Sequence, residues 1–166
     1  MPDAARLAVL AGTFDPLTLG HVDLITRSRR LFDRVTVAVL VNPGKAPLFT
    51  VEERVAMIRE ATADVPGVSV DAFGGLLADY VRQQGAVAIV RGLRNASEFA
   101  EEQPMALMNR HLHPGCETVF ILPSADRLHI SSRLVREIAS LGGSVEGLVP
   151  AGIAARLARR FGPGER

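Results

Sequence analysis

Five short apolar runs, each followed by a helical pattern, constrain the fold of this 166-residue chain more than any other feature. The runs are rich in valine and leucine and cover residues 7–11, 35–41, 68–72, 86–90 and 118–122. Apolar residues recur at helical spacing over residues 22–31, 51–63, 76–84, 98–111, 131–141 and 150–161. Strands that are apolar throughout and alternate with helices are typical of a parallel sheet covered on both faces. We therefore expect a doubly wound, Rossmann-like α/β fold with five parallel strands.

Length, charge and cysteine content limit what such a domain can do. The chain suits a single domain over residues 1–166, with a frayed tail at about residues 162–166. A net charge of +1 supplies no overall attraction to nucleic acid or to an anionic membrane, so neither is expected as a partner. The single cysteine, Cys116, excludes an internal disulfide and favours a reducing, cytoplasmic location. No apolar run approaches the ~20 residues of a membrane-spanning helix, and the N-terminus lacks a signal-peptide core.

Ligands of such folds bind beyond the carboxyl ends of the strands. The segments that follow the strands, residues 12–21, 42–49, 73–77, 91–95 and 123–132, are therefore expected to form one site. The first lacks both the GxGxxG fingerprint and the P-loop sequence, but it places Gly20 and His21 where a helix begins. An imidazole N–H and the N–H groups of a helix start can both donate to a phosphate oxygen. The alternative interpretation is that Gly20 only packs tightly and His21 only neighbours the helix cap.

The remaining segments add cations and a second helix start. Lys45 lies in a turn rich in proline and glycine, and Arg91 and Arg94 belong to the sequence RGLR after the fourth strand. The forked charge of arginine suits phosphate, although solvent exposure or an ion pair with Glu98 would also explain this pair. Ser131 is placed to cap the helix that follows it, which leaves N–H groups toward the site. Cations and donors without a paired carboxylate base suit phosphoryl or nucleotidyl transfer, in which the protein positions and neutralises the substrates.

Several stretches resemble the motifs of one enzyme family. TLGH at residues 18–21 matches the (H/T)xGH motif of a nucleotidyltransferase superfamily, and ISSRLVR at residues 130–136 resembles its second motif. Together with AGTFDPLTLGH, RGLR and MNRHL, they make residues 7–157 similar to the bacterial phosphopantetheine adenylyltransferases. The resemblance implies that 4'-phosphopantetheine attacks the α-phosphate of ATP directly, without a covalent intermediate. The products would be dephospho-coenzyme A and pyrophosphate, the penultimate step of coenzyme A biosynthesis, with Mg²⁺ as cofactor.

The resemblance also implies roles for individual residues. His21 would be the catalytic residue, donating to the α-phosphate as negative charge builds there. Phosphopantetheine would be bound by Thr13, Lys45, Leu77 and Arg91. The ATP site would be lined by Thr13, Phe14, His21, Gly92, Leu93, Arg94, Glu102, Arg127, Leu128, His129, Ile130, Ser131, Ser132 and Arg133. No side chain is assigned to the metal, and the family pattern implies a homohexamer that coenzyme A inhibits.

Two stretches depart from the family pattern. Residues 98–102 read EFAEE where the family has DFEYE, so that Glu101 replaces a tyrosine. Pro104 interrupts a helix that is continuous in the family, and this helix is expected either to kink or to begin near Glu102. Two alternatives remain. One is another (H/T)xGH nucleotidyltransferase, acting on nicotinate mononucleotide or glycerol phosphate; the other is a nucleotide-binding homologue without turnover.

Overall fold

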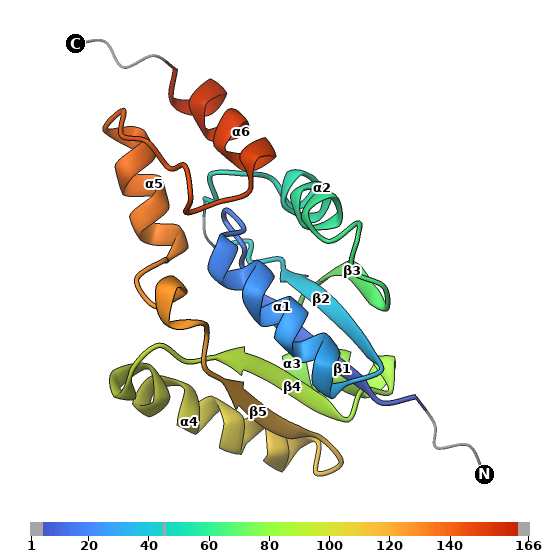
Figure 1. The fold of residues 1–166 in the computed structure, drawn as a ribbon. Helices are drawn as coiled ribbons and strands as arrows, with labels where there is room; N and C mark the ends of the chain where they lie inside the picture. The colour runs from blue at the N-terminus through green and yellow to red at the C-terminus, as the bar shows by residue number, and fades with distance from the viewer. Residues whose placement is uncertain (1–4, 45, 163–166) are drawn as a thin grey trace.

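The computed structural model describes residues 5–44 and 46–162, and Figure 1 shows their arrangement. Five strands form one sheet in the order β3-β2-β1-β4-β5, and all neighbouring strands are parallel. The expected doubly wound α/β fold is therefore confirmed. Along the chain the elements are β1 (Leu7–Gly12), α1 (Leu19–Leu31), β2 (Arg34–Leu40), α2 (Val51–Ala61), β3 (Val68–Phe73), α3 (Leu77–Gln84), β4 (Ala88–Gly92), α4 (Ala96–Leu112), β5 (Glu117–Ile121), the 3-10 helix η1 (Ala125–Arg127), α5 (Ser132–Ser140) and α6 (Ala151–Phe161).

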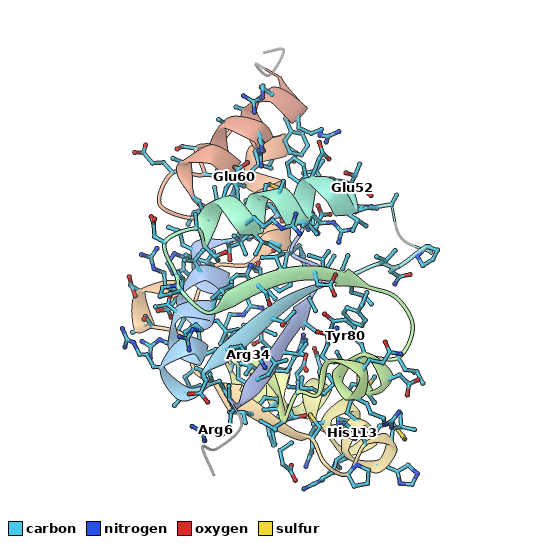
Figure 2. The ribbon with its side chains drawn as sticks, turned by 90° about the vertical axis from the view of Figure 1, so that its right-hand side faces the viewer. Arg6, Arg34, Glu52, Glu60, Tyr80 and His113 are labelled. Atoms are coloured by element: carbon cyan, nitrogen blue, oxygen red, sulfur yellow. The ribbon has the colours of Figure 1, made fainter. Side chains whose placement is uncertain are left out.

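The strand order reverses at the central strand β1. Strands β2 and β3 are added on one side of β1, and β4 and β5 on the other, so the chain crosses the sheet between β3 and β4. Right-handed crossovers place α1 and α2 on one face and α3 and α4 on the opposite face. Figure 2 shows the sheet between α2 and α6 on one side and α3 and α4 on the other. The loops after β1 and β4 consequently lie at the reversal point, where ligands of open α/β sheets bind.

Both faces of the sheet are buried, as the side chains of β1 show. Ala8 and Leu10 belong to a hydrophobic cluster that includes residues of α1, α2, α5 and α6. Leu7, Val9 and Ala11 belong to a second cluster on the opposite face, which includes residues of α3. Each fully buried valine or leucine contributes about 1.5–3 kcal/mol relative to an exposed one. This two-sided burial explains why the central strand β1 is apolar throughout, whereas the edge strand β3 alternates and exposes Ser69 and Asp71.

Capping residues set the helix starts. Helix α1 begins at Leu19 rather than near residue 22, because the side chain of its N-cap, Thr18, accepts from the His21 N–H. The expected capping box at α2 is present, with the Thr50 and Glu53 side chains each accepting a backbone N–H. Such a cap stabilises a helix by about 0.5–2 kcal/mol. The cap at Thr18 also fixes the backbone around His21, the predicted catalytic residue.

Helix α4 contains its proline rather than starting beside it. The side chain of Asn95 caps the helix by accepting the Glu98 N–H, and the helix then continues to Leu112 with Pro104 inside it. The alternative start near Glu102 is therefore wrong. The expected frayed tail lies outside the described residues except for Gly162, which is the C-cap of α6. Among the described residues, none of the helices has the length and apolar composition needed to span a bilayer.

Candidate active site

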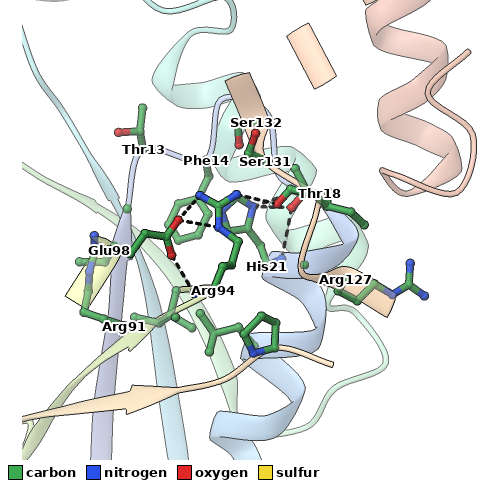
Figure 3. A pocket seen from close by; sticks show the side chains of 18 of the residues that line it. Thr13, Phe14, Thr18, His21, Arg91, Arg94, Glu98, Arg127, Ser131 and Ser132 are labelled. Carbon is green, nitrogen blue, oxygen red and sulfur yellow. Dashed lines mark hydrogen bonds and ion pairs between the residues drawn. The ribbon is translucent and has the colours of Figure 1, made fainter. Parts of the chain in front are cut away.

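A cavity of about 430 Å³ lies where the carboxyl ends of β1 and β4 meet the starts of α1 and α5 (Figure 3). Its volume falls in the range of about 300–1,000 Å³ that is usual for small-molecule sites. Three of the five predicted loops contribute to its lining, and no described residue of 42–49 or 73–77 does. The predicted site residues in the lining are Thr13, Phe14, His21, Arg91, Gly92, Arg94, Glu102, Arg127, Ile130, Ser131 and Ser132.

The other predicted site residues do not line this cavity. Leu93 is buried, and Leu77 packs at the edge of the cluster on the α3 face of the sheet. The side chains of Leu128, His129 and Arg133 are exposed. Lys45 lies outside the described residues. Their contacts with substrates stay predictions.

Thr18 holds the imidazole of His21 in one orientation at the start of α1. The Thr18 N–H donates to His21 Nδ1 at 3.0 Å, and the Thr18 hydroxyl lies 3.1 Å from the same nitrogen. The Phe14 ring meets the imidazole in a T-shaped contact, with 5.1 Å between the ring centroids. A backbone N–H can only donate, so Nδ1 is the acceptor and the ring proton of neutral His21 lies on Nε2. The capping arrangement therefore leaves a fixed N–H donor on the far nitrogen of the ring.

The surroundings of His21 keep it uncharged. Burial, and after it the positive charges of Arg94 and Arg91, together lower the pKa of His21 from 6.5 to about 4. The ring is therefore neutral at physiological pH, and its lone pair on Nδ1 is already engaged by Thr18. His21 can thus donate one hydrogen bond but is not placed to remove a proton.

Gly20 leaves space in the cavity rather than making a tight contact. A Cβ atom at this position would lie 3.5 Å from the Thr18 hydroxyl oxygen and 3.9 Å from the carbonyl oxygens of Arg127 and Ile130. These are ordinary van der Waals distances, so packing does not require glycine here. Gly20 itself lines the cavity, and its missing side chain leaves the N–H groups of the α1 start open to a ligand.

Two arginines of RGLR are paired with glutamates of α4. Arg91 bonds both oxygens of Glu102, at 2.8 and 2.5 Å, and Arg94 bonds Glu98, as Figure 3 shows for the second pair. Each arginine also donates to a backbone carbonyl oxygen, at 2.7 and 3.1 Å. The ion pair with Glu98 that the sequence left open is present for Arg94, and the pairing of Arg91 with Glu102 was not predicted. A guanidinium has five N–H groups, so two on each arginine have no recorded contact among the described residues.

Several residues that were not predicted as site residues also line the cavity, and three of them are acidic. Asp15, Glu98 and Glu101 join Glu102 in the cavity wall, alongside four arginines that include Arg136. The sequence does indicate where the helix that carries these glutamates begins, because Asn95 is followed three residues later by Glu98, a pattern typical of a helix start. Starting the helix there places Glu98, Glu101 and Glu102 along one side of it, three and four residues apart.

The acidic residues do not form a metal site by themselves. Within residues 5–44 and 46–162, no group of three or more His, Cys, Asp or Glu side chains could hold a metal ion. Both oxygens of Asp15 accept backbone N–H groups, at 2.7 and 2.9 Å, while Glu98 and Glu102 are paired with arginine. This donor set does not fit a cation held by protein ligands alone. Mg²⁺ is often bound mainly by substrate phosphates and water instead.

Comparison with known proteins agrees with this geometry. Residues 9–138 match the family model described as Cytidylyltransferase-like. The curated phosphopantetheine adenylyltransferase of Heliobacterium modesticaldum is 49% identical over 156 residues, which cover 94% of this chain and 93% of that protein. The protein of the same name from Alkalilimnicola ehrlichii is 54% identical over 159 residues, which cover 95% of this chain and 91% of that protein. The corresponding protein of Symbiobacterium thermophilum is 53% identical over 154 residues, with coverage of 93% and 95%. The chain therefore belongs to the phosphopantetheine adenylyltransferase family of nucleotidyltransferases.

Proposed function

We propose that this chain transfers the adenylyl group of ATP to 4'-phosphopantetheine, giving dephospho-coenzyme A and pyrophosphate in the biosynthesis of coenzyme A. The relatives with this name match nearly the whole chain at about half of its positions. The observation that carries the chemical step is the neutral imidazole of His21, whose Nδ1 is held by Thr18 and whose Nε2 bears the proton.

The reaction needs a donor but no base. A phosphate oxygen of phosphopantetheine forms a bond to the α-phosphorus of ATP, while the bond from that phosphorus to the β-bridging oxygen breaks. The electron pair of the broken bond leaves with pyrophosphate, and an ionised phosphate nucleophile has no proton to lose. Negative charge rises on the oxygens of the α-phosphate, where the His21 N–H would donate. A preorganised donor of this kind stabilises the transition state more than the ground state.

The two substrates are proposed to occupy adjoining parts of the cavity. The triphosphate would lie against the starts of α1 and α5, where Ser131 accepts the Leu134 N–H as N-cap, and near Arg94 and Arg127. Phosphopantetheine would contact Thr13 and Arg91 at the rim formed by β1 and β4. Nucleotidyltransferases generally use a divalent cation. We propose that Mg²⁺ enters bound to ATP, as part of the substrate.

We further propose that the chain acts as a single domain, in the cytoplasm, and as a homohexamer. Although α6 lies beyond the matched residues 9–138, its Ile153 and Leu157 are buried in the same core cluster as α1 and α2. Helix α4 supports self-association, because its only buried residue is Asn109 while Met105 and Met108 are more than half exposed. Coenzyme A is proposed as an inhibitor because it carries both the pantetheine arm and the adenine nucleotide.

A pyrophosphate-release assay tests the proposed reaction. With ATP, Mg²⁺ and phosphopantetheine, we expect stoichiometric formation of pyrophosphate and dephospho-coenzyme A, and none when phosphopantetheine is omitted. Nicotinate mononucleotide, offered in parallel, should give no product. Turnover with nicotinate mononucleotide but not with phosphopantetheine would make the chain a different nucleotidyltransferase. ATP binding without turnover of either substrate would make it a nucleotide-binding homologue.

A further inference from the structure

Asp23 joins the helix of His21 to the loop that follows β5. Its carboxylate oxygens accept the Ser124 N–H at 2.8 Å and the Ser124 hydroxyl at 3.0 Å, although the two residues are 101 positions apart. Arg27, one turn further along α1, places its Nε at 3.1 and 3.2 Å from the same oxygens. Its Nη2 also donates to the Ser124 hydroxyl at 2.7 Å. The three side chains thus form a closed cluster between α1 and the loop.

The cluster depends on an ionised carboxylate. Asp23 is 22% exposed and Arg27 is 39% exposed, so both are partly shielded from water. Burial acts to raise the pKa of Asp23, but the hydrogen bonds from Ser124 and the charge of Arg27 outweigh it, and the pKa lies below its ordinary value. An asparagine in the same place would turn an N–H group toward one of these donors.

The loop that Ser124 anchors forms one wall of the cavity. Arg127 and Ile130 line the cavity, and Ser131 is the N-cap of α5. The carbonyl oxygens of Arg127 and Ile130 also lie against the first turn of α1, 3.9 Å from the position that a Cβ atom on Gly20 would take. The three residues of the cluster are absent from the lining. They can therefore influence a bound nucleotide only through the loop and α1.

We propose that Asp23 is a positioning residue, which together with Arg27 and Ser124 holds the β5–α5 loop at the distance from His21 that ATP requires. The inference rests on the proposed function, because ATP is the ligand it concerns. Without the cluster, the loop is free to shift relative to α1, and the nucleotide loses contacts from one wall of the cavity. The proposed phosphopantetheine contacts come from β1 and β4, so binding of that substrate should change little.

The test measures the two substrates separately in matched variants. Asp23→Asn should raise the Kd of a non-hydrolysable ATP analogue and the KM for ATP about tenfold, since it removes hydrogen bonds to a charged group. Ser124→Ala, which keeps the backbone N–H, should raise both about threefold, and Ser124→Thr should restore them. The KM for phosphopantetheine should change less than about twofold in each variant, because its contacts lie elsewhere.

Glu60→Gln is the matched control. It removes the charge from another long-range ion pair, the 2.7 Å contact between Glu60 of α2 and Arg156 of α6. Neither residue lines the cavity, and Figure 2 labels Glu60 on α2. The substitution should leave both substrates unaffected. Unchanged analogue binding in the Asp23 and Ser124 variants would overturn the positioning role, and so would an equal loss for both substrates. The analogue binds without turnover, so an inactive wild-type chain would refute the proposed function while analogue binding in the variants still tests the positioning role.

Discussion

Replacing His21 with alanine removes the one side-chain donor that the structure fixes at the start of α1. The imidazole is oriented by the Thr18 N–H at 3.0 Å and by the Phe14 ring, so its Nε2 proton needs no reorganisation before the reaction. Losing one preorganised donor to a developing oxyanion costs about 2.7–4 kcal/mol of transition-state stabilisation, or roughly 100- to 1,000-fold in kcat. The affinity for ATP should change by less than about threefold, because the added charge is absent from the ground state.

The charge state of His21 gives the same prediction a second readout. With a pKa of about 4, the ring is neutral throughout the range from pH 5.5 to pH 9. Because the pKa is lowered, protonation would occur only as the pH falls toward 4, well below that range. The kcat of the wild-type enzyme should therefore show no ionisation between pH 6 and pH 7 that belongs to His21.

Pyrophosphate release at saturating substrates, measured from pH 5.5 to pH 9, tests both statements. ATP-analogue calorimetry supplies the affinity, and His111→Ala, which changes an exposed histidine outside the cavity, is the control. Turnover of His21→Ala within a few-fold of wild type would refute the donor role. An ionisation near pH 6.5 that disappears in His21→Ala would refute the neutral state.

Three further experiments test other parts of the structure, two with substitutions and one with the unchanged protein. In urea unfolding, Gly20→Ala should leave the free energy of unfolding unchanged or raise it by up to about 1 kcal/mol. It should nevertheless raise the KM for ATP about tenfold, because the new methyl group enters the cavity. An unchanged KM for ATP would show that no phosphate lies there. Pro104→Ala restores a backbone donor inside α4 and should raise the free energy of unfolding by about 1–3 kcal/mol. A lower free energy of unfolding would mean that the proline itself makes stabilising contacts. Burial and then the charge of Glu117 raise the pKa of Cys116 to about 11. Its thiol should consequently react with a disulfide reagent far more slowly in the native protein than in urea, and equal rates would contradict its burial.

The sheet was predictable from the sequence because its strands are buried on both faces. Residues 7–11 are apolar without alternation, and residues 35–41 are apolar except for Thr36. In the structure, successive apolar residues of these strands point into clusters on opposite faces of the sheet. The spacing of apolar residues predicted the helix starts less accurately, because the capping residue determines where the first turn of a helix begins. Thr18 starts α1 three residues earlier than the apolar pattern indicated.

The site was predictable to the extent that the ends of parallel strands meet. The loops after β1, β4 and β5 do meet, and they bring His21, Arg91 and Ser131 to one cavity. The pairing of Arg91 with Glu102 was not predicted, since it depends on where α4 begins and hence on which way its side chains face. If α4 began near Glu102, that residue would lie at the N-terminal end of the helix. In the structure α4 begins at Ala96, so Glu102 lies more than one turn further along.

The pairing changes how the proposed phosphate binding in this cavity must be explained. Four arginines line it, but four acidic residues do as well, and the whole chain carries a net charge of only +1. Net positive charge therefore cannot be the main source of affinity for a triphosphate. The glutamates instead hold Arg91 and Arg94 in fixed positions with two N–H groups each to spare, beside the N–H groups of two helix starts and the Nε2 proton of His21. Directed hydrogen bonds of this kind can follow charge as it moves from the α-phosphate to the leaving pyrophosphate, which an undirected excess of positive charge cannot do.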